Sequence, residues 1–543
     1  MDVLSLGLRA GVALVVLGSA LLVRWLDPGS RSWGRRLRSR LVAGVPWGTL
    51  IAGGVVILVY LVVQRGYANP YDPLYIPFSS WSYFYPLGVV LAPFSHQSLG
   101  HLTGNVLATV AIAPLAEYAF SHFPTRRGAS AFGSWRTNPY VRAFLLFPAG
   151  VIGVGLLTSV FAWGPIIGFS GVVFAFAGFA LVRYPISTVI ALSVRDVVGT
   201  VYAVLRDPIV PGAAGPSFGA PWWAGIAIQG HLLGFLLGVA LGTAVVTARR
   251  SEERPTVGRL WLGGVLVASN MTLWAVWWYR SGSAYVLYRG PGMLLVFALA
   301  MIVALTVSSA TERRVAGVSA RHIGLAVLLL PILTMGFVAV PLNATVVDDP
   351  VPPGESVRVR GYTVTYAEGV PNQRVGAIDL SILGETTTVN ASGVIVINAD
   401  RTIWTEAVSE GALAFAGERS VRVGGLGWST SIDAIRRGWS VTGGGTAYQV
   451  ALQPEDGPRT WVFQTSARTA SPTIAGLNLS VEPVDGSFTV SVTRGNRTLA
   501  TEPIPAMNES VRVGTLTVRR RGDRLIAIHG DTRVPFAARE TYE

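Results

Sequence analysis

A serine and a histidine inside long apolar stretches are the residues of this chain best suited to chemistry. Ser170 lies in Gly168-Phe169-Ser170-Gly171, and His231 lies in a second apolar stretch further along the chain. Polar groups placed in hydrocarbon are costly and are therefore candidates for function. A neutral imidazole can remove the proton of a serine hydroxyl and make the oxygen a nucleophile. The pair predicts nucleophilic catalysis by a serine–histidine dyad.

Two further polar residues, His101 and Asn105, are candidates for binding the negative charge that such a reaction generates. They are four positions apart, so they lie one above the other on a helix. Together with the backbone N–H of Ser170 they can donate to the oxyanion of a tetrahedral intermediate. The alternative is that both side chains simply bond across neighbouring helices. No acidic residue stands where a third triad member is expected, and cysteine is absent.

Small residues indicate that the segments carrying Ser170 and His231 pack closely together. At about 100° per residue, glycines three, seven and eleven positions after a histidine share its helical stripe. Glycine stripes let a neighbouring helix approach closely. We therefore expect Ser170 Oγ within hydrogen-bond reach of His231. The small residues are Gly234, Gly238 and Gly242 after the histidine, and Gly171, Ala175 and Gly178 after the serine.

The elements that must position these groups are membrane spans. Mean hydropathy is +0.48 and only 13% of the residues are charged, against about a quarter in soluble domains. The apolar residues fall into runs of about 20, the length that crosses a bilayer core. We predict a multi-pass protein of the cell membrane. Its ten expected spans are 4–25, 43–64, 98–120, 141–161, 168–184, 186–206, 222–247, 257–279, 291–310 and 322–341.

We interpret the net charge of +13 as a consequence of membrane topology rather than as a sign of a nucleic-acid-binding surface. Arginines cluster in the short links between alternate spans, which is typical of the cytoplasmic side. With ten spans, both termini are expected outside, and no nucleic-acid partner is expected. The arginine-bearing links are 31–40, 122–142, 183–185, 249–257 and 312–321.

Composition changes after Pro341, and residues 345–543 contain short β-prone runs broken by Gly, Asn and Asp. Residues 356–360 and 487–492 alternate apolar with polar positions, whereas residues 393–397 are continuously apolar, as in a strand buried on both faces. We expect an all-β sandwich- or barrel-like domain outside the membrane.

The scattered histidines predict no metal site and no cofactor. Five asparagines, Asn343, Asn390, Asn478, Asn496 and Asn508, begin N-x-Ser/Thr acceptors and are compatible with glycosylation.

The polar set resembles the rhomboid family of intramembrane serine proteases. The resemblance covers residues 43–247, under half of the chain, and implies six helices in the family's order. A GxSG motif alone is weak, but His-x3-Asn, GxSG and His-x2-Gly-x3-Gly, each on its own span and in the family's order, are specific together. The matching residues are Ser95, His96, His101 and Asn105, then Glu117, then Gly168, Ser170 and Gly171, then Gly230, His231, Gly234 and Gly238.

The resemblance implies a role for each matching residue. Ser170 is expected to be the nucleophile and His231 the general base, with His101 and Asn105 at the oxyanion. His96 resembles the family's additional histidine near a loop, with a structural role as the alternative. Glu117 resembles a glutamate that supports the first external loop, residues 65–97, and is also expected to be structural.

Two positions depart from the family pattern. Phe174 stands where many relatives have a tyrosine stacked on the catalytic histidine, so the stacking is kept and the hydroxyl is lost. The 65–97 loop lacks the Trp-Arg pair of many relatives. Neither departure removes a catalytic atom.

We therefore predict an intramembrane serine endopeptidase that cleaves in or near transmembrane helices of other proteins, with membrane lipids as its surroundings. One alternative is an inactive rhomboid-like protein that binds membrane clients. A transporter is a third hypothesis, for which Asp196 beside Arg195 is the one mid-span charge pair. The partner of the β domain is not predicted. The expected domains are 1–42 (an extra span and basic loop), 43–247 (the protease core), 248–344 (extra spans) and 345–543 (the β domain).

Overall fold

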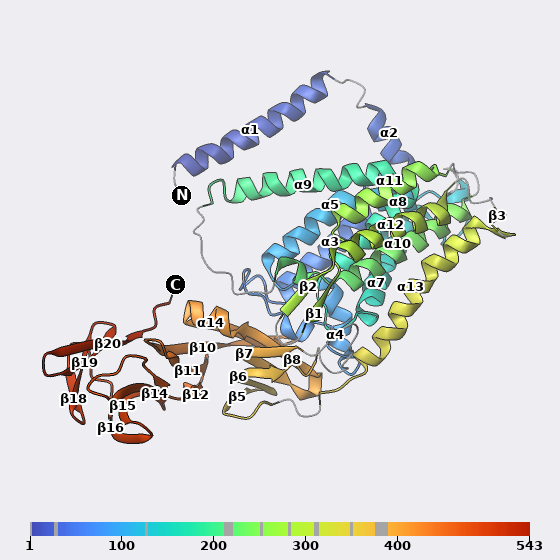
Figure 1. Cartoon of the computed structure of the whole chain (residues 1–543). Helices are drawn as coiled ribbons and strands as arrows, with labels where there is room; N and C mark the ends of the chain where they lie inside the picture. The colour runs from blue at the N-terminus through green and yellow to red at the C-terminus, as the bar shows by residue number, and fades with distance from the viewer. Residues whose placement is uncertain are drawn as a thin grey trace. The chain divides into compact units, whose positions relative to one another are not determined.

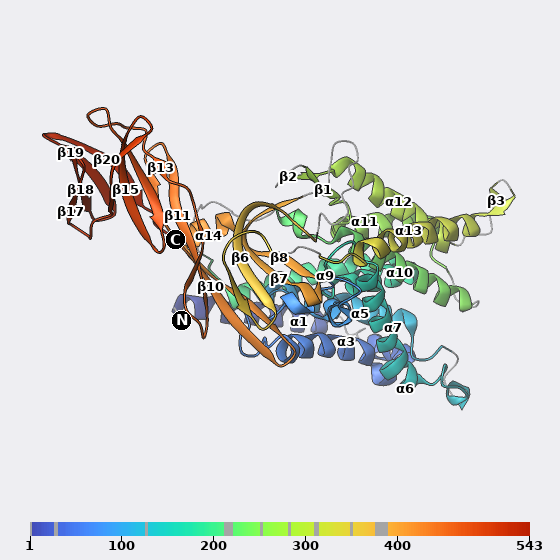
Figure 2. The same ribbon diagram turned by 90° about the horizontal axis from the view of Figure 1, so that it is seen from below.

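The structure is a computed structural model in which helices and strands form two separate compact units (Figures 1 and 2). The helical unit ends at Val346 and the β unit continues from Val347. Each unit is described by itself below. The structure describes residues 3–26, 31–124, 129–210, 221–249, 254–280, 284–308, 314–315, 317–347, 351–374 and 389–542.

Within the described residues, seven helical segments are long and apolar enough to cross a membrane, which confirms the membrane-spanning fold. Two shorter apolar helices, α3 with its π-helical continuation to Val63 and α8, accompany them. Basic α2 (Arg31–Arg40) follows α1. The other helices are α1 (Val3–Leu26), α3 (Trp47–Leu58), α4 (Pro86–Leu91), α5 (Leu99–Phe120), α6 (Pro139–Val141), α7 (Phe147–Val160), α8 (Ser170–Arg183), α9 (Pro185–Arg206), α10 (Ile228–Ala248), α11 (Val257–Asn270), α12 (Arg289–Val307) and α13 (Ala320–Asn343).

The span predicted over residues 257–279 is too long. Helix α11 ends at Asn270, and strand β1 (Trp277–Arg280) follows and pairs with β2 (Ala284–Leu287). The break lies at Thr272, whose φ of 57° is left-handed and incompatible with a continuing helix. The aromatic run after it favours an extended strand. Hydropathy alone does not distinguish this strand from more helix, because both are apolar.

The arginine-bearing links meet at one end of the helical unit. Arg142 donates to the carbonyl oxygens of Phe120 (3.0 Å) and Ser121 (3.0 Å), and Arg249 donates to the carbonyl oxygens of Ala119 (2.9 Å) and Phe120. These carbonyls belong to the last turn of α5 and its cap, where backbone acceptors lack helical partners and favour cations. The described parts of these links therefore share one end, which we call the arginine end.

The other arginine-bearing links lie at the same end. His122 N donates to the carbonyl oxygen of Arg40 (2.8 Å), which joins the first two links. The Tyr118 and Tyr184 rings lie 5.7 Å apart, which brings in the link between α8 and α9. Arg321 donates to Thr247 Oγ1 at 2.8 Å, which brings in the start of α13. The predicted sharing of one face is confirmed for the described residues.

Glu117 lies near the arginine end, and its predicted support of the 65–97 loop is wrong. Its carboxylate accepts from the backbone N–H groups of Gly48 and Thr49 and from Thr49 Oγ1, each at 2.7 Å, and bonds His122 Nε2 at 2.7 Å. The unpaired N–H groups at a helix start favour such an anion. Glu117 is 16 positions, or about 24 Å at 1.5 Å per residue, from His101 along α5, so it cannot support a loop near that histidine.

We expect Glu117→Gln to destabilise the helical unit by about 2 kcal/mol, because hydrogen bonds to a buried charge are the strong ones. Thermal unfolding in detergent measures the change. Asp207→Asn is the matched control, since this acid is exposed at the end of α9. Equal stability losses in the two variants would show that the fully buried carboxylate of Glu117 contributes no more to the free energy of unfolding than an exposed carboxylate does.

The β unit contains three described sheets, all antiparallel, in agreement with the predicted β-rich region. The strand orders are β5-β6-β7-β8, β12-β11-β10-β20-β19-β18-β17 with β9 also on β10, and β13-β14-β15-β16. The bounds are β5 (Ser356–Val359), β6 (Tyr362–Pro371), β7 (Asn390–Asn398), β8 (Ile403–Ser409), β9 (Glu418–Gly425), β10 (Trp428–Val441), β11 (Gly445–Pro454), β12 (Thr460–Gln464), β13 (Arg468–Thr469), β14 (Asn478–Val484), β15 (Ser487–Arg494), β16 (Arg497–Pro503), β17 (Ser510–Val513), β18 (Leu516–Arg521), β19 (Arg524–His529) and β20 (Thr532–Arg539), with helix α14 (Glu410–Ala416) after β8.

The continuously apolar run at 393–397 belongs to β7, which pairs with β6 on one side and β8 on the other. Val394, Ile395 and Val396 are fully buried, so both faces of the strand are covered, as predicted. Of the glycosylation acceptors, Asn390, Asn496 and Asn508 are exposed. Asn343 is buried, and its amide already donates to a backbone carbonyl, which contradicts a glycan at that position.

Candidate active site

Helices α8 and α10 pack against each other with their backbones in contact (Figure 1). A Cβ at Gly234 would overlap the carbonyl oxygen of Gly171, and one at Gly238 would overlap that of Ala175. At Gly242 the nearest atom would be the Phe179 carbonyl oxygen, 3.0 Å away. The glycine stripe therefore exists because backbone atoms of α8 occupy the space of side chains. The predicted contact between these two helices is confirmed.

This packing places the serine and the histidine side by side. Ser170 is the first residue of α8, and its Oγ lies 2.8 Å from His231 Nε2. The Phe174 ring, one turn after the serine, stacks on the imidazole with the ring centroids 4.2 Å apart and the planes 13° apart. His231 Nδ1 is buried and has no hydrogen-bond partner among the described residues. The arrangement is a dyad whose imidazole plane is held by an aromatic ring.

Gly168 brings the segment before the serine against His101. Its φ of +124° lies in a region that residues with side chains rarely adopt. A Cβ at this position would lie 2.6 Å from His101 Cε1 and 3.7 Å from Asn105 Nδ2. A side chain here would displace the His101 imidazole, so glycine at residue 168 allows the segment before the serine to lie against His101.

Asn105 Nδ2 is a buried donor without a hydrogen-bond partner in the described part of the chain. Buried polar groups are nearly always paired, so an unpaired donor close to Gly168 requires a reason. The side chain is 7% exposed and lies on the same face of α5 as His101. The arrangement leaves this donor available to an acceptor that arrives with a reactant.

His96 packs edge-on against His101, with ring centroids 4.9 Å apart. Burial lowers the pKa of His96 to about 3, and the neighbouring His101 adds to that lowering. The ring is therefore neutral at physiological pH. The backbone of His96 is held on both sides by Gln64, whose Oε1 accepts from His96 N (2.8 Å) and whose Nε2 donates to His96 O (2.7 Å).

The segment from Phe161 to Phe169, which we call the nucleophile loop, connects α7 to Ser170. Gln229 of α10 accepts from Trp163 N (3.1 Å) and donates to the Phe161 carbonyl oxygen (2.8 Å). Ser80 and Ile166 exchange two backbone-directed bonds: Ser80 N donates to Ile166 O and Ile166 N donates to Ser80 Oγ, each at 3.0 Å. Gly168 N donates to Ala92 O at 2.9 Å. The loop is thus held from three directions.

Gln64, Gln229 and Ser80 were not predicted as site residues. The available signal is strongest for Gln229, a polar side chain two positions before His231 in an apolar run. Gln64 likewise ends the apolar run of α3. Ser80 lies in a loop rich in serine and aromatic residues and has no distinguishing pattern.

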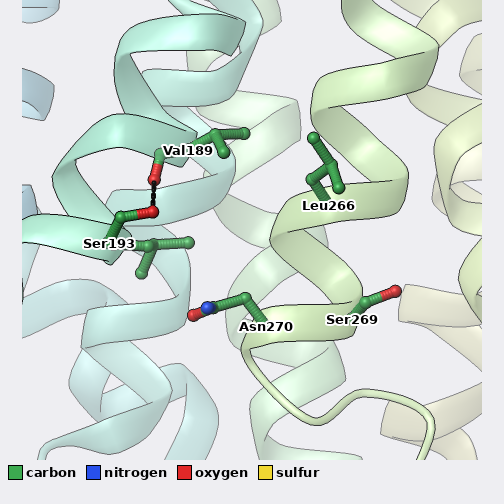
Figure 3. A pocket seen from close by; sticks show the side chains of 6 residues that line it. Val189, Ser193, Leu266, Ser269 and Asn270 are labelled. Atoms are coloured by element: carbon green, nitrogen blue, oxygen red, sulfur yellow. Dashed lines mark hydrogen bonds between the residues drawn. The ribbon is translucent and has the colours of Figure 1, made fainter. Parts of the chain in front are cut away.

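The remaining polar features lie away from the dyad. Arg195 and Asp196 form an ion pair at 2.7 Å with side-chain exposures of 26% and 52%, and Asn270 is near both. A neighbouring hollow of about 350 Å³ between α9 and α11 is lined by Val189, Leu192, Ser193, Leu266, Ser269 and Asn270 (Figure 3). None of these six lining residues has an ionisable side chain. Among the described residues, no group of His, Cys, Asp or Glu is arranged to hold a metal ion.

Part of this chain, including the residues around the dyad, matches a known protein family. Residues 83–248 match the family model of the rhomboid domain. Searches of curated proteins and of solved structures returned no match. The matched range contains α5, α7, α8, α9 and α10, and so contains both members of the dyad.

Proposed function

We propose that this chain, with its rhomboid domain at residues 83–248, is an intramembrane serine endopeptidase. The family to which such domains belong usually consists of intramembrane serine proteases. The observation that carries the proposal is the 2.8 Å separation of Ser170 Oγ and His231 Nε2 at a contact between two helix backbones. A serine and an imidazole at hydrogen-bond distance are the minimum machinery for acyl transfer.

Each of these atoms has a role in the proposed reaction. His231 Nε2 accepts the Ser170 hydroxyl proton while Oγ attacks the scissile carbonyl carbon, which forms a tetrahedral oxyanion. The Ser170 N–H, the unpaired Asn105 amide and His101 donate to that oxyanion. His231 then gives the proton to the leaving amine as the C–N bond breaks. Water, deprotonated by the same imidazole, hydrolyses the acyl-enzyme and restores the serine hydroxyl.

The depth of the serine supports cleavage within the membrane. Helix α8 has 14 residues and so is about 21 Å long, which is shorter than the roughly 30 Å hydrocarbon core. Its C-terminal end lies at the arginine end, which we assign to the cytoplasmic side. Ser170 then lies in the outer half of the bilayer, where water must enter from the outer side.

This orientation also supports an outer location for the β unit. Helix α13 starts at the arginine end, near Arg321, and ends at Asn343 just before the β unit. We therefore propose that the protein lies in a cell membrane with its β domain on the extracytoplasmic side.

The proposed substrates are transmembrane proteins whose helices unwind near the cleaved bond. Helix-destabilising residues are therefore favoured near that bond, with small residues at the cleavage position.

The alternative function is the binding of membrane clients without cleavage. Relatives of that kind usually lack the serine or the histidine, whereas this chain has both at bonding distance. Active-site labelling separates the two functions, because a fluorophosphonate reacts only with an activated serine.

We expect detergent-purified protein to become labelled by a fluorophosphonate on the peptide that contains Ser170, and to cut single-span substrates in or beside their spans. Mass spectrometry locates both the adduct and the cut. Protein that retains the substrates on pull-down yet neither reacts nor cuts would instead establish client binding.

A further inference from the structure

Asn343, the last residue of α13, lies where three separate segments of the helical unit meet. The side chain is 3% exposed. Its Nδ2 donates to the carbonyl oxygen of Ala162 at 2.7 Å and, more weakly, to that of Val160 at 3.4 Å. Both carbonyls lie where α7 ends and the nucleophile loop begins, where helical acceptors lack intrahelical partners. An asparagine amide from another helix thus caps the end of α7.

The backbone of Asn343 holds a third segment. Its carbonyl oxygen accepts from Tyr83 N and from Ser82 Oγ, each at 2.9 Å. The Tyr83 hydroxyl completes the arrangement by donating to the Val160 carbonyl oxygen at 2.6 Å. The end of α13, the segment around residues 82–83 and the end of α7 are therefore joined to one another by buried and partly buried hydrogen bonds.

The nucleophile loop depends on such bonds for its position. It has no helix or strand between α7 and α8, and a segment without regular structure must lose backbone entropy to adopt one conformation. Asn343 holds its beginning, Ser80 holds Ile166, and the Ala92 carbonyl holds Gly168. Two residues after Gly168 the chain reaches Ser170, so displacement at the beginning of the loop is carried toward the nucleophile.

Helix α13 contributes one more bond but otherwise presents much of its surface away from the bundle. Trp163 Nε1 in the nucleophile loop donates to the Met335 carbonyl oxygen at 3.0 Å. Phe337, by contrast, is 79% exposed. The helix lies outside the matched rhomboid domain, which ends at residue 248. An element beyond that domain therefore contacts the loop that leads to Ser170.

We propose that Asn343 is a positioning residue for the reaction. Helix α13 then contributes to proteolytic activity in addition to connecting the helical unit to the β unit. The inference rests on the proposed function. Asn343 fixes the start of the nucleophile loop, which sets the approach of Ser170 and its backbone N–H to the substrate carbonyl.

Asn343→Leu tests the proposal, since leucine has a similar volume but donates no hydrogen bond. We expect kcat to fall about 10- to 100-fold with KM changed less than about twofold, because a displacement near 1 Å can cost that much in rate. Asn343→Gln keeps an amide donor and should recover part of kcat. Phe337→Ala on the exposed side of the same helix is the matched control and should behave as wild type.

Hydrogen exchange of the backbone at residues 161–168 provides a readout independent of turnover. We expect faster exchange there in Asn343→Leu, with the α8 and α10 amides unchanged. Wild-type kcat in Asn343→Leu would overturn the proposal, as would a loss of kcat with unchanged loop exchange or with no recovery in Asn343→Gln. If the wild type neither cuts nor reacts with fluorophosphonate, the proposed function fails instead, whatever the exchange shows.

Discussion

Alanine at Ser170 or at His231 is expected to lower kcat by about 10⁴-fold or more, the loss seen when a nucleophile or its base is removed from a serine hydrolase. Without the serine oxygen no acyl-enzyme can form. Without the imidazole the hydroxyl keeps its proton and the leaving amine receives none. Cleavage of a single-span substrate under single-turnover conditions measures the loss.

The double variant should be no slower than either single variant, because the two side chains act as one unit and their effects do not add. Ser193→Ala is the matched control: this serine also lies in an apolar helix, but its hydroxyl donates to the Val189 carbonyl oxygen at 3.2 Å, away from the dyad (Figure 3). Each variant must keep the thermal unfolding of the wild type. Substantial cleavage by a folded Ser170→Ala protein would identify a different nucleophile.

The α8–α10 contact was predictable from sequence because helical periodicity carries the information. Glycines at fixed intervals after His231 define one face, and backbone approach is the physical reason for having them. The prediction for Glu117 failed because it came from a family resemblance rather than from spacing. A rise of 1.5 Å per residue already separates this glutamate from His101 by most of a membrane's thickness.

The bonds that hold the nucleophile loop were not predictable in this way. Gln229 and Asn343 bond backbone carbonyls 68 and 181 positions away, and a backbone carbonyl has no residue type that a sequence can display. The triplet that Asn343 begins is a local pattern and is compatible with glycosylation, whereas the burial of Asn343 depends on tertiary structure that no local pattern displays. The strand order of the β unit was not predictable for the same reason, because it depends on long-range pairing: β20 pairs with β10 across about a hundred residues of intervening chain.

The second large effect is expected at Gly234, where a single methyl group should separate α8 from α10. The Cβ of Gly234→Ala would overlap the Gly171 carbonyl oxygen, and a backbone atom cannot turn aside as a flexible side chain can. Overpacking of this kind costs about 2 kcal/mol, sometimes more. Because the contact sets the distance between Ser170 and His231, cleavage should fall with stability.

A glycine-to-alanine replacement elsewhere in a membrane helix provides a control in which no loss of stability is expected. Gly153 of α7 has no atom within 4 Å of the position of a Cβ. Alanine there should be neutral or stabilising by up to about 1 kcal/mol, because alanine has the higher helix propensity. Thermal unfolding and kcat are measured for both the Gly234→Ala and the Gly153→Ala variants and compared with the wild type. If Gly234→Ala is as stable and active as Gly153→Ala, the two helices can separate without moving the dyad, and the glycine stripe does not set the geometry of the site.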